Sequence, residues 1–148
     1  MDRAASAIHT ADRALRSLEM LGALPPTTDI ERDAATQRFA CTFEAVWKAA
    51  RAVLLSREVV AAASPKGGVR ASHSTGFLDQ REAEEALVMV DDRSLTSHTY
   101  QEDVARATRE RLPGYAKVLR SWASHMRAGP SPTKEAPGTR RGAYSAMQ

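Results

Sequence analysis

Apolar residues recur at steps of three and four along most of this 148-residue chain, which is the spacing of amphipathic helices. The first helix is expected over residues 3–23, before the pair Pro25–Pro26. The second and longest is expected over residues 29–57, with Asp29 as its N-cap. Each should bury one stripe of side chains: Ala7, Ala11, Leu15, Leu18 and Leu21 on the first helix, and Ala35, Phe39, Phe43, Val46, Ala50, Val53 and Leu54 on the second.

Capping signals predict two more helices in the middle of the chain. Ser64–Pro65 has the form of an N-cap followed by a first-turn proline, and it predicts a short third helix. Gly67–Gly68 weakens that helix, which is expected to end before Gly76. Asp79 is then expected to cap a fourth helix that runs to about residue 97.

A fifth helix is expected from about Gln101 through Trp122, kinked or split where it meets Pro113–Gly114. Residues 129–148 are rich in proline and glycine and have no period, so this tail is expected to be disordered. The sequence therefore predicts an all-α protein. Its single domain, residues 1–128, is an up-down four-helix bundle with an additional short helix.

Charge and cysteine content narrow the function classes. The net charge is +3, of which the tail contributes most through Lys134, Arg140 and Arg141, so the bundle itself is nearly neutral. A protein that binds nucleic acid through phosphate neutralisation alone is therefore excluded, and any RNA must bind at a local site. The one cysteine, Cys41, can form neither an intramolecular disulfide nor a cysteine metal cluster. The apolar runs are short and no signal segment is evident, so we expect a cytoplasmic protein that has no membrane partner.

The usual catalytic motifs are absent from the sequence. No glycine-rich phosphate loop follows a strand, no HExxH motif occurs, and the four histidines lack metal-ligand spacing. We therefore expect neither a metal nor a cofactor. The segment from Asp91 to Tyr100 is the exception, because arginine, histidine and tyrosine occur together near the end of the fourth helix.

Arg93 and His98 allow two interpretations. Five residues along a helix is about 140° of rotation, so the two converge only if the helix ends near residue 97 or a second copy faces the first. Arginine would then grip a phosphate and histidine would move protons, which would cleave RNA without a metal. In the alternative interpretation Arg93 pairs with Asp91 or Asp92, and His98 hydrogen-bonds the last carbonyls of the helix.

Two sequence blocks together carry a family resemblance. The first block, residues 37–48, reads QRFACTFEAVWK, and the second, residues 92–100, reads DRSLTSHTY. They are similar to the QRFExTFExxWK helix and the DRNLTSHTY segment of the HEPN family, in its branch of nucleotidyltransferase substrate-binding proteins. Ala63–Ser64–Pro65 between them is similar to the start of the family's middle helix. The resemblance extends from about residue 5 to 126.

The resemblance implies a helical bundle that forms a homodimer and acts as the ribonuclease toxin of a toxin–antitoxin pair. Its Arg-x4-His-x-Tyr motif maps onto Arg93, His98 and Tyr100, with Ser94 as a supporting polar residue. Arg93 and His98 would be catalytic on an RNA substrate. The partner would be a minimal nucleotidyltransferase antitoxin that transfers AMP to Tyr100, placing bulk and negative charge beside the motif.

Two alternatives stay open. Other members of the family imply a non-catalytic accessory subunit that binds substrate for a two-component nucleotidyltransferase, and a purely structural bundle is the third possibility. The chain also departs from the family pattern, with Ser94 in place of the usual Asn and Ala40 in place of a frequent Glu. Of the other charged residues, Glu44 and Lys48 have the spacing of a solvated ion pair within one helix.

Overall fold

The computed structural model describes residues 2–22, 28–57, 64–98 and 102–129. Within these residues the chain forms five helices and no strand. The predicted tail lies almost wholly outside them, since the description ends at Gly129. The helices are α1 (Arg3–Gly22), α2 (Asp29–Ser56), α3 (Pro65–Thr75), α4 (Gln80–His98) and α5 (Glu102–Ala128).

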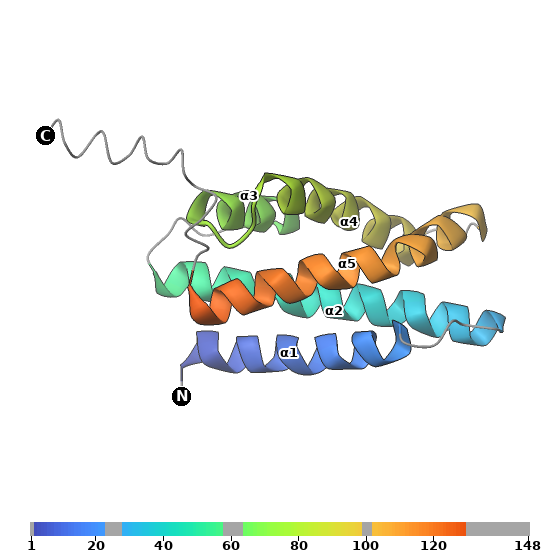
Figure 1. Cartoon of the computed structure of the whole chain (residues 1–148), viewed down its shortest axis with the longest axis horizontal. Coiled ribbons are helices and arrows are strands. Elements are labelled where there is room, and N and C mark those ends of the chain that lie inside the picture. The colour runs from blue at the N-terminus through green and yellow to red at the C-terminus, as the bar shows by residue number, and fades with distance from the viewer. Residues whose placement is uncertain (1, 23–27, 58–63, 99–101, 130–148) are drawn as a thin grey trace, which may run out of the picture.

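The helices form an up-down bundle (Figure 1). Helices α1 and α4 run in one direction along the long axis, and α2 and α5 return between them. Helix α1 packs against α2 and α5 on one side, while α3 and α4 cover the other side. This arrangement confirms the predicted all-α bundle, in which α3 is the additional short helix.

The predicted stripe of α2 forms the centre of the core. Phe39 and Phe43 are fully buried, and their rings contact Tyr115 and Trp122 of α5 at centroid distances of 5.4 and 6.4 Å. On α1 the prediction holds for the middle of the stripe, but Leu21 is 37% exposed, because it lies one residue before the helix ends. Burial of large aromatic and aliphatic side chains is the main force that holds such a bundle together.

The start of α2 differs from the prediction by one residue. Thr28, not Asp29, is the N-cap. Its Oγ1 accepts a hydrogen bond from the backbone N–H of Glu31 at 3.1 Å, and the Glu31 carboxylate accepts one from the backbone N–H of Thr28 at 3.2 Å. This reciprocal capping box satisfies two backbone donors, which an Asp29 cap without a glutamate or glutamine three residues on would not do.

The other predicted helix ends are confirmed. The Ser64 hydroxyl caps α3, and Gly76 ends it in the left-handed conformation at φ 96°, which glycine adopts without strain. Asp79 and Glu82 form a second capping box at the start of α4, with hydrogen bonds of 2.8 and 3.0 Å. These caps fix the residue at which α4 begins. They therefore help to decide which later residues of α4 lie opposite α2.

Helix α5 is not split at Pro113–Gly114. It continues as one helix of 27 residues with Pro113 inside it. Both residues are exposed, so the proline ring lies on the solvent side and the core contacts of Tyr115 are kept.

Polar contacts between helices supplement the core. The Trp122 indole N–H donates to Ser72 Oγ at 3.0 Å, joining α5 to α3. Arg120 of α5 binds Asp12 and Glu19 of α1 at 2.6 and 2.9 Å. Its hydrogen bond to Asp12 holds the pKa of that carboxyl below its usual value.

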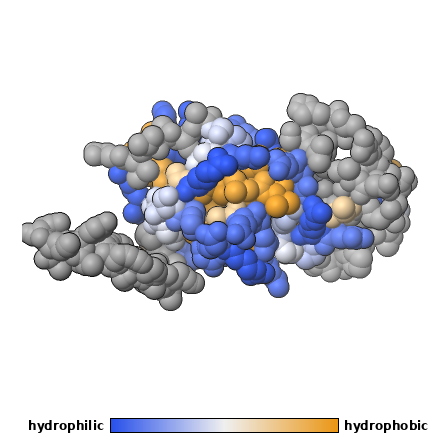
Figure 2. All heavy atoms as spheres, turned by 90° about the horizontal axis from the view of Figure 1, so that it is seen from above, coloured by the Kyte–Doolittle hydropathy of each residue, from blue (hydrophilic) through white to orange (hydrophobic). Residues whose placement is uncertain are grey.

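Figure 2 shows the face over α3 and α4. Apolar residues gather in the middle of this face and hydrophilic residues border them. On α4, Val88 is a large apolar side chain that is 44% exposed. No helix in the described part of the chain has an apolar stretch sufficient to cross a membrane.

Candidate functional site

Arg93, the motif arginine, reaches from α4 across to α2. Its Nη1 donates to Glu44 Oε1 at 2.9 Å. The local pairing with Asp91 or Asp92, which is the alternative interpretation of the sequence, is wrong: Asp91 binds Lys66 of α3 at 3.1 Å, and Asp92 faces α5. The physical reason is the helix itself, because neighbouring positions differ by about 100° around the axis and face different helices.

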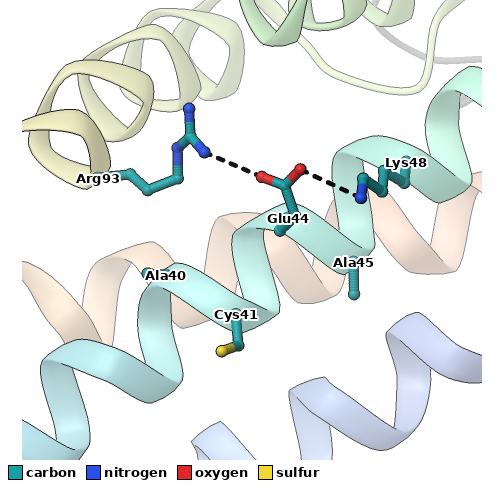
Figure 3. A pocket seen from close by; sticks show the side chains of 6 residues that line it. All are labelled: Ala40, Cys41, Glu44, Ala45, Lys48 and Arg93. Carbon is teal, nitrogen blue, oxygen red and sulfur yellow. Dashed lines mark hydrogen bonds and ion pairs between the residues drawn. The ribbon is translucent and has the colours of Figure 1, made fainter. Parts of the chain in front are cut away.

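Glu44 is shared between two cations (Figure 3). Its Oε1 accepts from Arg93, and its Oε2 lies 3.5 Å from the Nζ of Lys48, one turn further along α2. The Lys48 side chain is 61% exposed, so the predicted solvated pair with Glu44 is confirmed. The sequence did not predict that this pair also binds the motif arginine.

The guanidinium of Arg93 also lies over an aromatic ring. Its Cζ is 5.7 Å from the ring centroid of Phe43, which precedes Glu44 on α2. Phe43 is fully buried, so its ring is fixed by the core. A cation over the face of such a ring is attracted to it, and this contact holds the guanidinium near α2.

An open pocket of about 400 Å³ lies beside this cluster. Small side chains from α2 leave the space open, and the charged groups stand at its edge (Figure 3). The charged residues among its described lining are two cations and one carboxylate, a balance that favours an anionic ligand over a cationic one. It is lined by Ala40, Cys41, Glu44, Ala45, Lys48 and Arg93.

Asp92, the residue before Arg93, is anchored to α5. Its buried carboxylate accepts a hydrogen bond from the Tyr115 hydroxyl at 2.6 Å and from Arg111 Nη1 at 2.8 Å. Burial raises the pKa of Tyr115 to about 12, and the hydrogen bond to Asp92 adds to the rise. Tyr115 therefore does more than pack in the core, because it also fixes the α4 residue beside the motif arginine.

The remaining motif residues lie at the edge of the residues that the structure describes. The backbone of Ser94 and His98 belongs to α4, which ends at His98, and their side chains lie outside the described residues. Tyr100 lies between α4 and α5, also outside the described residues. Among the residues that the structure does describe, no group of three or more His, Cys, Asp or Glu is placed to hold a metal ion.

Glu44 is the site residue that sequence reasoning missed as a partner of the motif. The sequence did hold a signal of this contact, since Glu44 belongs to the first of the two blocks that resemble family motifs and Arg93 to the second. The structure joins these blocks through one hydrogen bond between residues 49 positions apart.

Comparisons with known proteins agree with this architecture. Residues 6–128 match the family model described as nucleotidyltransferase substrate binding protein like. The crystal structure of a protein from Thermus thermophilus is similar, with 49% sequence identity and a TM-score of 0.75. The match covers 79% of this chain and 98% of that one. None of the curated proteins compared with this chain matches it.

Proposed function

Because this chain belongs to the nucleotidyltransferase substrate binding protein like family, we propose that it is the toxin half of a HEPN-type toxin–antitoxin pair. In this proposal it is a cytoplasmic, homodimeric ribonuclease that needs no metal. The observation that carries the proposal is the contact of Arg93 with Glu44, which brings the two motif blocks together beside a pocket lined by Arg93 and Lys48.

In the proposed reaction Arg93 binds the phosphate that is to be cleaved, and Ser94 adds a polar contact. His98, as a base, takes the proton of the adjacent ribose 2′-hydroxyl, whose oxygen attacks the phosphorus. The bond to the 5′-oxygen breaks, and a protonated histidine from the motif of the second copy donates a proton to that oxygen. The products are a 2′,3′-cyclic phosphate and a 5′-hydroxyl.

The homodimer would supply the second motif. The apolar patch over α3 and α4 supports it, because exposed apolar surface bordered by polar residues is typical of interaction sites (Figure 2). Helix α4 carries both the exposed Val88 and the motif arginine.

The partner is proposed to be a minimal nucleotidyltransferase that transfers AMP from ATP to Tyr100. The AMP group would bring a phosphate close to Arg93 and compete there with RNA. Tyr100→Phe should abolish labelling by radioactive ATP and the partner enzyme; labelling of that variant at the wild-type level would move the acceptor elsewhere.

The second candidate is a non-catalytic accessory subunit, and the description of the matching family, which speaks of substrate binding, favours it. The same pocket would then present an anionic substrate to a nucleotidyltransferase. Both candidates expect a nucleotidyltransferase partner, so the presence of one does not separate them. Toxicity on expression alone, relieved by that partner, distinguishes the toxin from the accessory subunit.

The test of the proposed activity is RNA cleavage in EDTA by protein freed of AMP. The wild type should cleave, and His98→Ala should reduce cleavage at least about a hundredfold, since it removes the general base. The circular dichroism of the two proteins should be the same, which excludes unfolding as the cause. Cleavage by both proteins contradicts the role of His98, and cleavage by neither favours the accessory subunit.

A further inference from the structure

The carboxylate of Glu44 occupies the position that an anionic ligand of Arg93 would take. It accepts a hydrogen bond from Arg93 at 2.9 Å and lies 3.5 Å from Lys48, so one anion bridges two cations of different helices. Arginine binds phosphate oxygens in the same way that it binds carboxylate oxygens. A phosphate that approaches Arg93 therefore competes with Glu44 for the same donors.

The exposure of the ion pair between Arg93 and Glu44 allows a phosphate to replace the Glu44 carboxylate. Glu44 is 36% exposed, so its carboxylate can turn into water and be hydrated again. Half-exposed ion pairs contribute little to stability, and breaking one has a correspondingly small penalty. Arg93 stays in place meanwhile, because its guanidinium lies over the buried Phe43 ring.

Lys48 would then act as a second cation for the ligand. Its ammonium approaches Glu44 from the opposite side to Arg93, so both donors are directed at the point that Glu44 fills (Figure 3). Ala40, one turn before Glu44, has a small side chain that leaves room on this side of α2, in the pocket of about 400 Å³.

We propose that the pocket between α2 and α4 is a phosphate-binding subsite in which Glu44 is an internal competitor, displaced when an RNA phosphate binds Arg93 and Lys48. This inference rests on the proposed function and assigns two residues to it. Lys48 is a phosphate ligand, and Glu44 limits affinity by repelling the phosphate and by occupying its donors.

The test is the binding of a fluorescent 2′-O-methyl RNA oligonucleotide, which lacks the 2′-hydroxyl that cleavage needs. Glu44→Gln keeps the shape of the side chain and removes its charge, and it should tighten binding about fivefold at low salt. Lys48→Gln should weaken binding by a similar factor. The change made by Glu44→Gln should shrink at high salt, where screening weakens all such charge effects.

A matched control separates this effect from a change in overall charge. Glu85 of α4 also forms a half-exposed pair four residues apart, with Arg81 at 3.4 Å, so Glu85→Gln removes the same charge elsewhere. Ala40→Glu should change RNA affinity in the opposite direction to Glu44→Gln. It adds a carboxylate to the pocket one turn before Glu44, and it should therefore weaken binding. Inorganic phosphate should displace the oligonucleotide at lower concentration from Glu44→Gln than from Glu85→Gln.

The outcomes distinguish this inference from the proposed function. Binding by Glu44→Gln that is equal to that of Glu85→Gln, or weaker than that of the wild type, overturns the inference, since a merely orienting glutamate would lower affinity when changed. If Arg93→Gln at the same time abolishes RNA cleavage, the proposed function stands without the inference. If Arg93→Gln cleaves RNA like the wild type, the proposed function itself fails.

Discussion

Two arginines join neighbouring helices in this bundle, and the most buried carboxylate that each one binds differs in exposure. Arg120 contacts Asp12, whose side chain is only 9% exposed. It also binds Glu19, whose side chain is 40% exposed, through two nitrogens at 2.9 and 3.0 Å. Arg93 contacts Glu44, which is 36% exposed and shared with a lysine. A buried partner cannot be rehydrated if the arginine leaves, whereas an exposed one can. The first contact therefore maintains the fold, and the second is suited to exchange with a ligand.

The largest expected effect is on the Arg120 contact. Arg120→Met keeps much of the stem's packing but leaves Asp12 buried, with Arg16 at 3.0 Å and Arg127 at 3.8 Å as its remaining cations. Removing one member of a buried pair costs several kcal/mol, and since Arg16 and Arg127 remain we expect a loss of about 2 kcal/mol in the free energy of unfolding. Urea denaturation measures it. A loss no greater than that of Arg93→Met would contradict the comparison.

Acid should weaken the same contact. The hydrogen bond from Arg120 lowers the pKa of Asp12 below its ordinary value of 3.8. The carboxylate therefore stabilises the fold fully above that value, and the contribution is lost as the pH falls through the lower pKa of the folded state. Stability measured from pH 6 to pH 2 should fall more steeply below about pH 4 for the wild type than for Asp12→Asn. Parallel curves would show that Asp12 is not the group responsible.

The smallest expected effect on stability is at Arg93. Arg93→Met breaks a half-exposed pair, and we expect it to lower the free energy of unfolding by less than about 1 kcal/mol. The same variant should lose RNA binding and cleavage, because the phosphate ligand is gone. Urea denaturation and the oligonucleotide assay on one preparation test both statements. A large loss in the free energy of unfolding, with RNA binding unchanged, would show that Arg93 stabilises the fold and does not bind the ligand.

The sequence predicted the parts of the fold that depend on local pattern. The stripe through Phe39 and Phe43, the cap at Ser64 and the stop at Gly76 each follow from periodicity or capping chemistry within a few residues. The predicted N-cap of α2 is wrong by one residue because Thr28 and Asp29 both have side chains that cap helices well. The glutamate three residues after Thr28 decides between them.

The partners of the motif arginine were beyond such reasoning. Spacing along one helix says which residues share a face, but not which residue of another helix lies opposite. Spacing predicts the pair of Glu44 with Lys48 on one helix, and it offers Asp91 or Asp92 as partners of Arg93 in only one of two interpretations. The structure keeps the first pairing and replaces the second with a contact across 49 residues.

Consecutive residues of α4 face different neighbours. Asp92 is held by Arg111 and Tyr115 of α5, while Arg93 faces α2. Opposing attachments of this kind prevent α4 from rolling about its own axis, because any rotation that improved one contact would pull the other apart. The direction in which Arg93 points is thus set by its neighbour in the sequence, and a change at Asp92 would misdirect the arginine without touching it.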